Sequence, residues 1–206
     1  MLPIYLASAS PRRRELLEQL GLSFAVTVGN VDESIGEALP PGRMVEVLSE
    51  RKAGKVAGEL DSGLVIGSDT VVVWRDRIMG KPRDGQEALE MLACLQGDEH
   101  SVYSGLAVIN AATGATHVSH ERTRVFFRPA GRDELEKYIA TGEPLGKAGA
   151  YAIQGLGSVF VEGIEGCYST VVGLPLAKLA GALKEFGVDV LDRPPAKVIP
   201  AERKGE

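Results

Sequence analysis

The chain has 206 residues, a length that suits one compact domain or two small lobes sharing a core. Hydrophobic residues make up 44% of it, which argues against bulk disorder. With 23 Lys and Arg against 28 Asp and Glu, the net charge is −5. This balance argues against non-specific nucleic-acid binding, but it leaves room for an anionic small ligand held by a local basic cluster.

Helices and strands alternate along the chain, judged from hydrophobic period and from capping residues. In chain order we expect a strand over Pro3–Ala7, a helix from Pro11 to a stop at Gly21, a strand over Ser23–Val28, a helix over Arg43–Leu60, a strand over Leu64–Trp74 with a short return strand over Arg77–Met79, a helix over Asp84–Gln96, a long hairpin over 100–128, a helix over Arg132–Ala140, a strand over Val159–Ile164 and a helix over Leu174–Phe186. This order predicts a mixed α/β (α+β) fold, with a mixed sheet and flanking helices.

Linkers, cysteines and apolar segments indicate how many domains the chain has and in which cellular compartment it lies. No linker-like stretch divides it, so we expect a single domain over residues 1–191 and a flexible C-terminal tail over residues 192–206. Cys94 and Cys167 lie far apart, and with three scattered histidines they form no zinc pattern. The start of the chain does not resemble a signal peptide, and no apolar run approaches the roughly 18 residues of a membrane helix. We therefore expect a cytoplasmic protein with reduced cysteines.

Three adjacent arginines open the first predicted helix. Arg12, Arg13 and Arg14 fall where the helix dipole is already positive, so an anion is needed to offset them unless they simply face solvent. Free backbone N–H groups, the hydroxyls of Ser8 and Ser10, and the guanidinium groups together make a phosphate cradle. The alternative is an ordinary solvated basic face.

Charged residues also interrupt two apolar segments. Lys52 shares a helix face with Leu48 and Val56, so its ammonium either extends to solvent or enters a cavity. Asp69 interrupts an apolar strand and shares the face of Val71, so it lies either at a bend or in a site that supplies a partner. A buried carboxylate is costly, which favours the site.

Three further polar residues have both a functional and an ordinary interpretation. Lys81, in Gly-Lys-Pro, is a charge on a stiff turn, and Glu33 lies in an acidic loop; both are also typical of plain surface positions. Gln154 stands among small and apolar residues, where its amide either reads a ligand or bonds to the backbone. Neither a dinucleotide-binding glycine fingerprint nor a Walker phosphate loop is present.

A series of short motifs resembles the Maf family of nucleoside triphosphate pyrophosphatases, over about residues 4 to 190. The matching segments, in order, are Ser8–Arg13 (SASPRR), Asp32–Glu33, Glu50–Ala53 (ERKA), Gly67–Val72 (GSDTVV), Gly80–Pro82, Thr141–Pro144 (TGEP), Lys147–Gly155 (KAGAYAIQG) and Val171–Leu176 (VVGLPL). Each segment is modest alone, and the ordered series is highly specific.

The resemblance implies cleavage between the α- and β-phosphates of a nucleoside triphosphate, a divalent cation (Mg²⁺ or Mn²⁺), and two lobes around a nucleotide cleft. Arg12, Thr70 and Gln154 are similar to the subgroup that hydrolyses dTTP and UTP, whereas another subgroup, acting on N7-methylated GTP, has Trp, Gln and Glu there. Two positions depart from the family pattern: Gly146 replaces a common Asp, and Thr170 replaces a common Asn. The Gly146 departure predicts slower turnover if the usual Asp holds metal or orients water.

Roles for the residues follow as hypotheses. Asp69 is expected to accept a proton and, with Glu33, to hold the metal, while Thr70 and Gln154 read the pyrimidine. The expected substrate-binding residues are Ser8, Arg12, Arg13, Lys52, Thr70, Lys81 and Gln154. The expected partner is a nucleoside triphosphate, with no polymeric nucleic acid and no membrane.

Other interpretations stay open at the level of sequence. The chain could instead be a nucleotide-binding regulator, for instance of cell division, with weak or lost hydrolysis. It could also be a pyrophosphatase for a modified nucleotide, or a sugar- or lipid-phosphate hydrolase. The oligomeric state is also open, a homodimer included.

Overall fold

A computed structural model describes residues 2–35 and 39–192. Its helices are α1 (Pro11–Gln19), α2 (Pro41–Ala57), α3 (Gly85–Leu95), α4 (Arg132–Ala140), α5 (Tyr168–Val172) and α6 (Leu176–Glu185), with 3₁₀ turns η1 (Ala148–Ala150) and η2 (Leu156–Phe160). Its strands are β1 (Ile4–Leu6), β2 (Ala25–Val26), β3 (Leu64–Trp74), β4 (Arg77–Met79), β5 (Glu99–Asn110), β6 (Thr116–Phe127) and β7 (Val161–Glu165). Apart from Asp192, the expected C-terminal tail lies outside the described residues.

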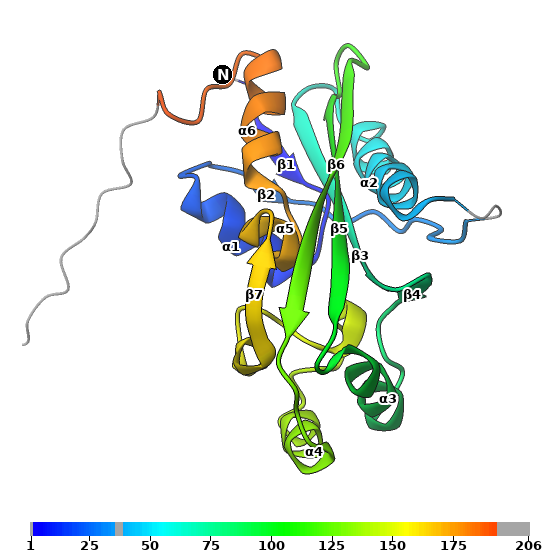
Figure 1. The fold of residues 1–206 in the computed structure, drawn as a ribbon. Coiled ribbons are helices and arrows are strands. Elements are labelled where there is room, and N and C mark those ends of the chain that lie inside the picture. Colours follow the sequence, from blue (N-terminus) through cyan, green and yellow to red (C-terminus); the bar gives the residue numbers. More distant parts are fainter. Residues whose placement is uncertain (1, 36–38, 193–206) are drawn as a thin grey trace, which may run out of the picture.

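One mixed sheet organises these elements. Its strand order is β2-β1-β3-β5-β6-β7, and β4 pairs with the far end of β3. The β1 strand is parallel to β2 and β3, whereas the other pairings are antiparallel. The long β5–β6 hairpin runs through the middle of the molecule in Figure 1, with α2 on one side and α1, α5 and α6 on the other. The expected mixed α/β fold is confirmed.

The two ends of the long strands carry different hydrophobic cores. At one end, α1 and α6 pack on one face of the sheet through leucines such as Leu17 and Leu183, and α2 packs on the opposite face through Ala53 and Val56. At the other end, α3, α4 and the 3₁₀ turns enclose a second cluster around Phe160. The strands β3, β5 and β6 run through both ends, so two lobes share one sheet.

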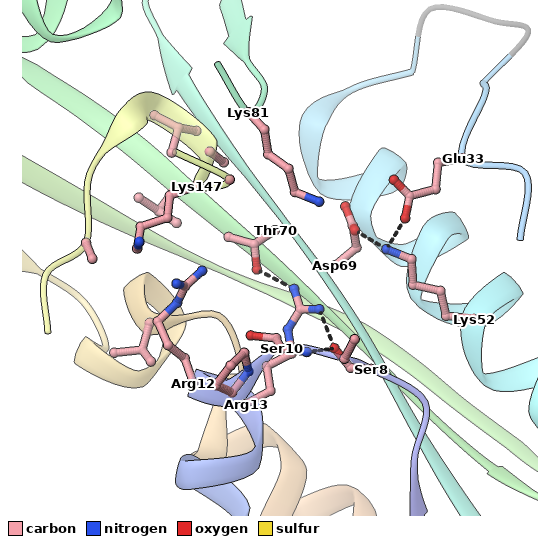
Figure 2. Close-up of a pocket in the computed structure, with 18 of the residues that line it drawn as sticks. Ser8, Ser10, Arg12, Arg13, Glu33, Lys52, Asp69, Thr70, Lys81 and Lys147 are labelled. Atoms are coloured by element: carbon pink, nitrogen blue, oxygen red, sulfur yellow. Dashed lines mark hydrogen bonds and ion pairs between the residues drawn. The ribbon is translucent and has the colours of Figure 1, made fainter. Parts of the chain in front are cut away.

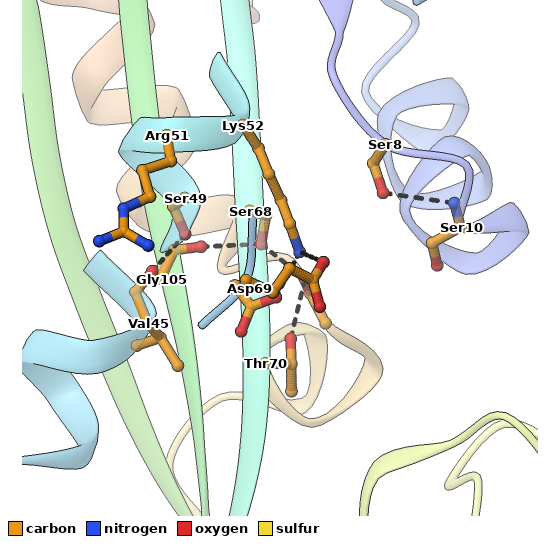
Figure 3. Close-up of polar contacts among 12 residues, drawn as sticks. Ser8, Ser10, Val45, Ser49, Arg51, Lys52, Ser68, Asp69, Thr70 and Gly105 are labelled. Atoms are coloured by element: carbon orange, nitrogen blue, oxygen red, sulfur yellow. Dashed lines mark hydrogen bonds and ion pairs between the residues drawn. The ribbon is translucent and has the colours of Figure 1, made fainter. Parts of the chain in front are cut away.

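The α2 helix lies unusually close to the sheet because two glycines face it. A Cβ atom built on Gly105 would stand 2.2 Å from the carbonyl oxygen of Val45, and one on Gly67 would stand 2.3 Å from that of Ser49. Ser49 turns its hydroxyl back to the Val45 carbonyl of its own helix (Figure 3). This close approach brings the next turn of α2, with Lys52, against β3.

Among the strands that the structure describes, the middle of β3 has a neighbour on one edge only. Towards its start, β3 pairs with β1 as far as Ile66, and towards its end it pairs with β4 from Val72 onward. Residues 67–71 between these pairings bond to β5 alone among the described strands. We call this segment the open edge of β3. Side chains from both faces of the sheet reach the same space around it.

Several predicted bounds differ from the structure. The helix expected over Arg43–Leu60 is Pro41–Ala57, and the strand expected over Val159–Ile164 is Val161–Glu165. The strand expected over Ser23–Val28 is only Ala25–Val26, since the segment is a partly exposed sheet edge with little to pair against. The last helix begins at Leu176 rather than Leu174, because Gly173 adopts φ 127° and Pro175 serves as the N-cap. The short helix α5 before this break was not anticipated.

Candidate functional site

A cavity of about 460 Å³ opens at the open edge of β3. It is lined by the β1–α1 connection, the start of α1, the loop around Glu33, Lys52 of α2, β3, the segment around η1 and the end of α5. In Figure 2, Arg12 and Lys147 lie on one side, the Lys52, Asp69 and Glu33 group lies on the other, and Arg13 and Thr70 lie between them. All the expected substrate-binding and metal-binding residues line this cavity.

The three arginines of α1 divide between the cavity and the surface. Arg14 forms an exposed pair with Glu18, 2.8 Å from its Nε, on the outer side of the helix. Arg12 and Arg13 line the cavity, and burial lowers the pKa of both guanidinium groups. The helix begins at Pro11, directly after Ser10, whose backbone N–H donates to Ser8 Oγ at 3.3 Å. The cradle interpretation therefore fits two of the three arginines.

Arg13 is fixed on three sides within the site. Its Nε donates to the carbonyl oxygen of Gly173 at 2.8 Å, its Nη1 to Ser8 Oγ at 3.1 Å, and its Nη2 to Thr70 Oγ1 at 3.1 Å. The negative charge of Asp69 partly offsets the effect of burial on its pKa. A guanidinium group stays protonated in any case, so this position carries a permanent positive charge.

Lys52 points into the cavity, where two carboxylates share its ammonium group. Its Nζ lies 2.6 Å from Asp69 Oδ1 and 2.7 Å from Glu33 Oε1. The side chains of Lys52 and Asp69 are 16% and 13% exposed, whereas that of Glu33 is 56% exposed. The bond from Lys52 lowers the pKa of Glu33, despite an opposing effect of partial burial, and the charge of Lys81 lowers it further. Figure 3 shows Lys52 reaching from α2 to Asp69 on β3.

The alternation expected for β3 explains how Asp69 is presented. Val71 and Val73 face α2 and pack on Val45, and Asp69 lies on that same face. Thr70 points to the opposite face, toward Arg13. Because the edge of β3 is open here, both side chains line one cavity.

A third lysine on the cavity wall, besides Lys52 and Lys81, was not anticipated as a site residue. Lys147 lies just before η1, and its ammonium donates to the carbonyl oxygen of Glu143. Burial lowers the pKa of Lys147, and the nearby charge of Arg12 lowers it further. The available signal was a single charge within the Gly- and Ala-rich segment 146–157, next to the motif glutamine.

The two residues expected to read the base differ in how they are held. Gln154 is exposed and lines the cavity, and within the described residues its amide makes no hydrogen bond. The Thr70 hydroxyl bonds to Arg13 and lies 2.8 Å from Ser104 Oγ. The amide of Gln154 therefore keeps both its donor and its acceptor for a ligand.

The donor set suits a divalent cation bound together with a phosphate ligand. Asp69 and Glu33 both contact the same Nζ atom, so their oxygens converge on one point. No cluster of three or more His, Cys, Asp or Glu occurs in the part of the chain that the structure describes. Mg²⁺ is commonly held by one or two carboxylates plus substrate phosphates, and the pair present fits that pattern.

Comparison with known proteins identifies the class of this molecule. The family model described as Maf-like protein matches residues 3–186, and the chain belongs to this family. A protein from Pelotomaculum thermopropionicum is 56% identical over 191 residues, covering 93% of this chain and all of the relative. One from Moorella thermoacetica is 52% identical over 193 residues, covering 94% of this chain and all of the relative. One from Bacillus cereus (strain ZK / E33L) is 47% identical over 190 residues, covering 92% of this chain and 98% of the relative. All three relatives are named dTTP/UTP pyrophosphatase.

Proposed function

We propose that this protein is a nucleoside triphosphate pyrophosphatase that hydrolyses dTTP and UTP to the monophosphate and pyrophosphate. The observation that carries the proposal is the convergence of four cationic side chains and two carboxylates on one cavity, listed in chain order as Arg12, Arg13, Glu33, Lys52, Asp69 and Lys81. The names of relatives that match nearly the whole chain support the choice of substrate.

The cationic side chains would bind the triphosphate. A triphosphate carries close to four negative charges, and hydrolysis requires that these charges be neutralised and the phosphates aligned. Arg13 is already held in place by Gly173, Ser8 and Thr70, so little of its freedom is lost on binding. Lys81 carries no ion pair within the described residues and extends from the opposite wall. Arg12 and Lys147 supply charge at the far side.

Asp69 is our candidate for accepting the proton of the attacking water. Its Oδ1 is held by Lys52, and its Oδ2 makes no hydrogen bond among the described residues, so one oxygen is available to a ligand. The bond to Lys52 keeps the carboxylate oriented toward the cavity.

Asp69 and Glu33 would also hold the divalent cation, Mg²⁺ or Mn²⁺. When bound, such an ion neutralises phosphate charge and lowers the pKa of a coordinated water. Lys52 would then exchange part of its contact with the carboxylates for phosphate oxygens, since all three groups share one point.

Gln154 is proposed to select the pyrimidine. Uracil and thymine present an imide with both a donor and an acceptor, and a primary amide can match both. Its position on the wall of the same cavity, with its amide free to bond to a ligand, supports this assignment. With such a substrate, we place the enzyme in the cytoplasm. Within the described residues, no helix has the length and apolar character to cross a membrane.

A nucleotide panel with detection of pyrophosphate tests the proposal. We expect release of pyrophosphate from dTTP and UTP in the presence of Mg²⁺, and a loss of at least about 100-fold in kcat for Asp69→Asn. Asp76→Asn, in the exposed β3–β4 turn, is the matched control and should keep full activity. Tight binding of dTTP without turnover would instead support a nucleotide-binding regulator. Cleavage that ignores the base would support a general phosphate hydrolase.

A further inference from the structure

A buried row of hydroxyls connects the backbone of α5 to Arg13. Ser104, on β5, is fully buried and donates from Oγ to the carbonyl oxygen of Thr170 at 2.7 Å. The Ser104 and Thr70 hydroxyl oxygens are 2.8 Å apart, and Arg13 Nη2 donates to Thr70 Oγ1 at 3.1 Å. Three elements far apart in sequence, β5, β3 and α1, are thereby joined through side chains. Figure 2 shows the last of these bonds.

The chemistry of the end groups fixes the direction of every bond in this row. A carbonyl oxygen only accepts, so the single hydrogen of Ser104 is used on Thr170. Ser104 therefore accepts the hydrogen of Thr70. A guanidinium group only donates, so the oxygen of Thr70 accepts from Arg13. The alternative acceptor for the Thr70 hydrogen, the carbonyl of Gly173, is farther away at 3.4 Å.

The row leaves Thr70 no hydrogen to give to a nucleobase, and it leaves Arg13 two donors for a ligand. Of the five N–H groups of Arg13, one each goes to Gly173, Ser8 and Thr70. One N–H remains on each terminal nitrogen. Such a pair matches two oxygens of a phosphate group.

We propose that Ser104 and Thr70 are positioning residues, which fix the Arg13 guanidinium toward the phosphates of the substrate. Thr70 acts through Arg13 in this scheme, and Ser104 acts through Thr70. The proposal rests on the proposed function. It adds Ser104 to the machinery, and it gives Thr70 a role in holding the triphosphate in place of a contact with the base.

The test compares variants of both hydroxyls in two backgrounds. Thr70→Val keeps the shape of the side chain and removes its hydroxyl, Ser104→Ala removes the next hydroxyl, and Thr70→Ser keeps the row. We expect Thr70→Val and Ser104→Ala to lower kcat/KM for dTTP and UTP by about 10-fold, in line with the loss of one hydrogen bond to a charged group. Thr70→Ser should keep kcat/KM within about threefold of the value for the unmodified protein. The order of preference among dTTP, UTP, CTP and GTP should stay unchanged.

The second background, Arg13→Lys, separates positioning from general damage to the fold. Lysine lacks the guanidinium fork, so adding Thr70→Val to Arg13→Lys should change kcat/KM by less than about twofold. A full 10-fold further loss in that background, or a changed nucleotide preference in Thr70→Val, would overturn the proposal. Ser104→Ala also leaves the buried carbonyl of Thr170 without its donor, which could destabilise the fold. Thr70→Val keeps the bond from Ser104 to Thr170, so a loss of activity in that variant is not explained by this destabilisation.

Failure of the proposed function would be recognised separately. If the unmodified protein releases no pyrophosphate from any nucleotide, the same set of variants is measured by calorimetric binding of dTTP. The same non-additive pattern in Kd would then support the positioning row without hydrolysis. Additive effects in Kd would reject it.

Discussion

His100 should make the stability of this protein fall as the pH is lowered. The residue lies on β5, 3% exposed, with the rings of Phe127 and Tyr151 edge-on at 4.9 and 5.3 Å. Its Nε2 lies 2.8 Å from the Tyr151 hydroxyl, and its Nδ1 has no hydrogen-bond partner among the residues that the structure describes. An imidazolium needs two acceptors, so the protonated form is poorly accommodated. Burial lowers the pKa of His100 to about 4.

The size and the sign of the effect follow from this pKa. A histidine in the unfolded chain titrates near 6.5, so between pH 6.5 and 4 the unfolded state binds a proton that the folded state does not. The free energy of unfolding therefore decreases as the pH falls through this window, by about 2 kcal/mol at pH 5 and about 3 kcal/mol at pH 4. Above about pH 7.5 the residue is neutral in both states and contributes no pH dependence.

Urea unfolding between pH 4.5 and 7.5 measures the effect, with His100→Gln as the non-titrating variant. Carboxylates add the same pH dependence to the unfolding free energy of both proteins. The difference between the two curves of unfolding free energy against pH therefore isolates the contribution of His100. We expect that difference to change by about 2.5 kcal/mol across the range. Tyr151→Phe, which keeps the imidazole buried, should retain the slope of the unmodified protein. Parallel curves for the unmodified protein and His100→Gln would refute the reasoning.

Three further predictions concern two glycines and the proposed specificity residue Gln154. Gly105→Ala on β5 should lower the free energy of unfolding in urea by about 3 kcal/mol, because its Cβ would meet the Val45 carbonyl of α2. The control is Gly54→Ala on α2, whose Cβ would have only Ile109 nearby, at 3.9 Å. This variant should be neutral or stabilising. Gly146→Asp should lower the Mg²⁺ concentration for half-maximal activity, since the site is open and its φ of 75° is one that Asp and Asn tolerate; Gly146→Asn is the uncharged control. Gln154→Glu should change the ranking of nucleotides in a pyrophosphate assay, and an unchanged ranking would reject its role in reading the base.

Much of the fold could be predicted because local patterns were strong. The return strand Arg77–Met79 and the helix Arg132–Ala140 were predicted with the observed bounds, since turn residues and apolar period agree there. The helix α5 was missed because its five residues, Tyr168–Val172, are too few to show a period. The second strand was predicted too long, because propensity does not report whether a pairing partner exists.

The site could be predicted in part, through residues that disagree with their surroundings. Asp69 within an apolar strand indicated a site, whereas Lys52 on an apolar helix face left both solvent and a cavity open. The structure pairs the two residues directly. Ser104 and Lys147 were not found, because a serine in a strand and a lysine in a loop are ordinary at the level of sequence. Their importance depends on tertiary contacts with Thr70 and Arg12, which the sequence does not contain.

The open edge of β3 also bears on the tendency of the chain to aggregate. An unpaired stretch of strand is a template on which another chain can add, and exposed edges of this kind promote aggregation. Here the stretch is short, spanning residues 67–71, and it lies between the pairings of β3 with β1 and with β4. It also carries the inward-pointing charge of Asp69, with Lys52 beside it. The gap that admits a small anionic ligand is thus closed to a foreign β-strand.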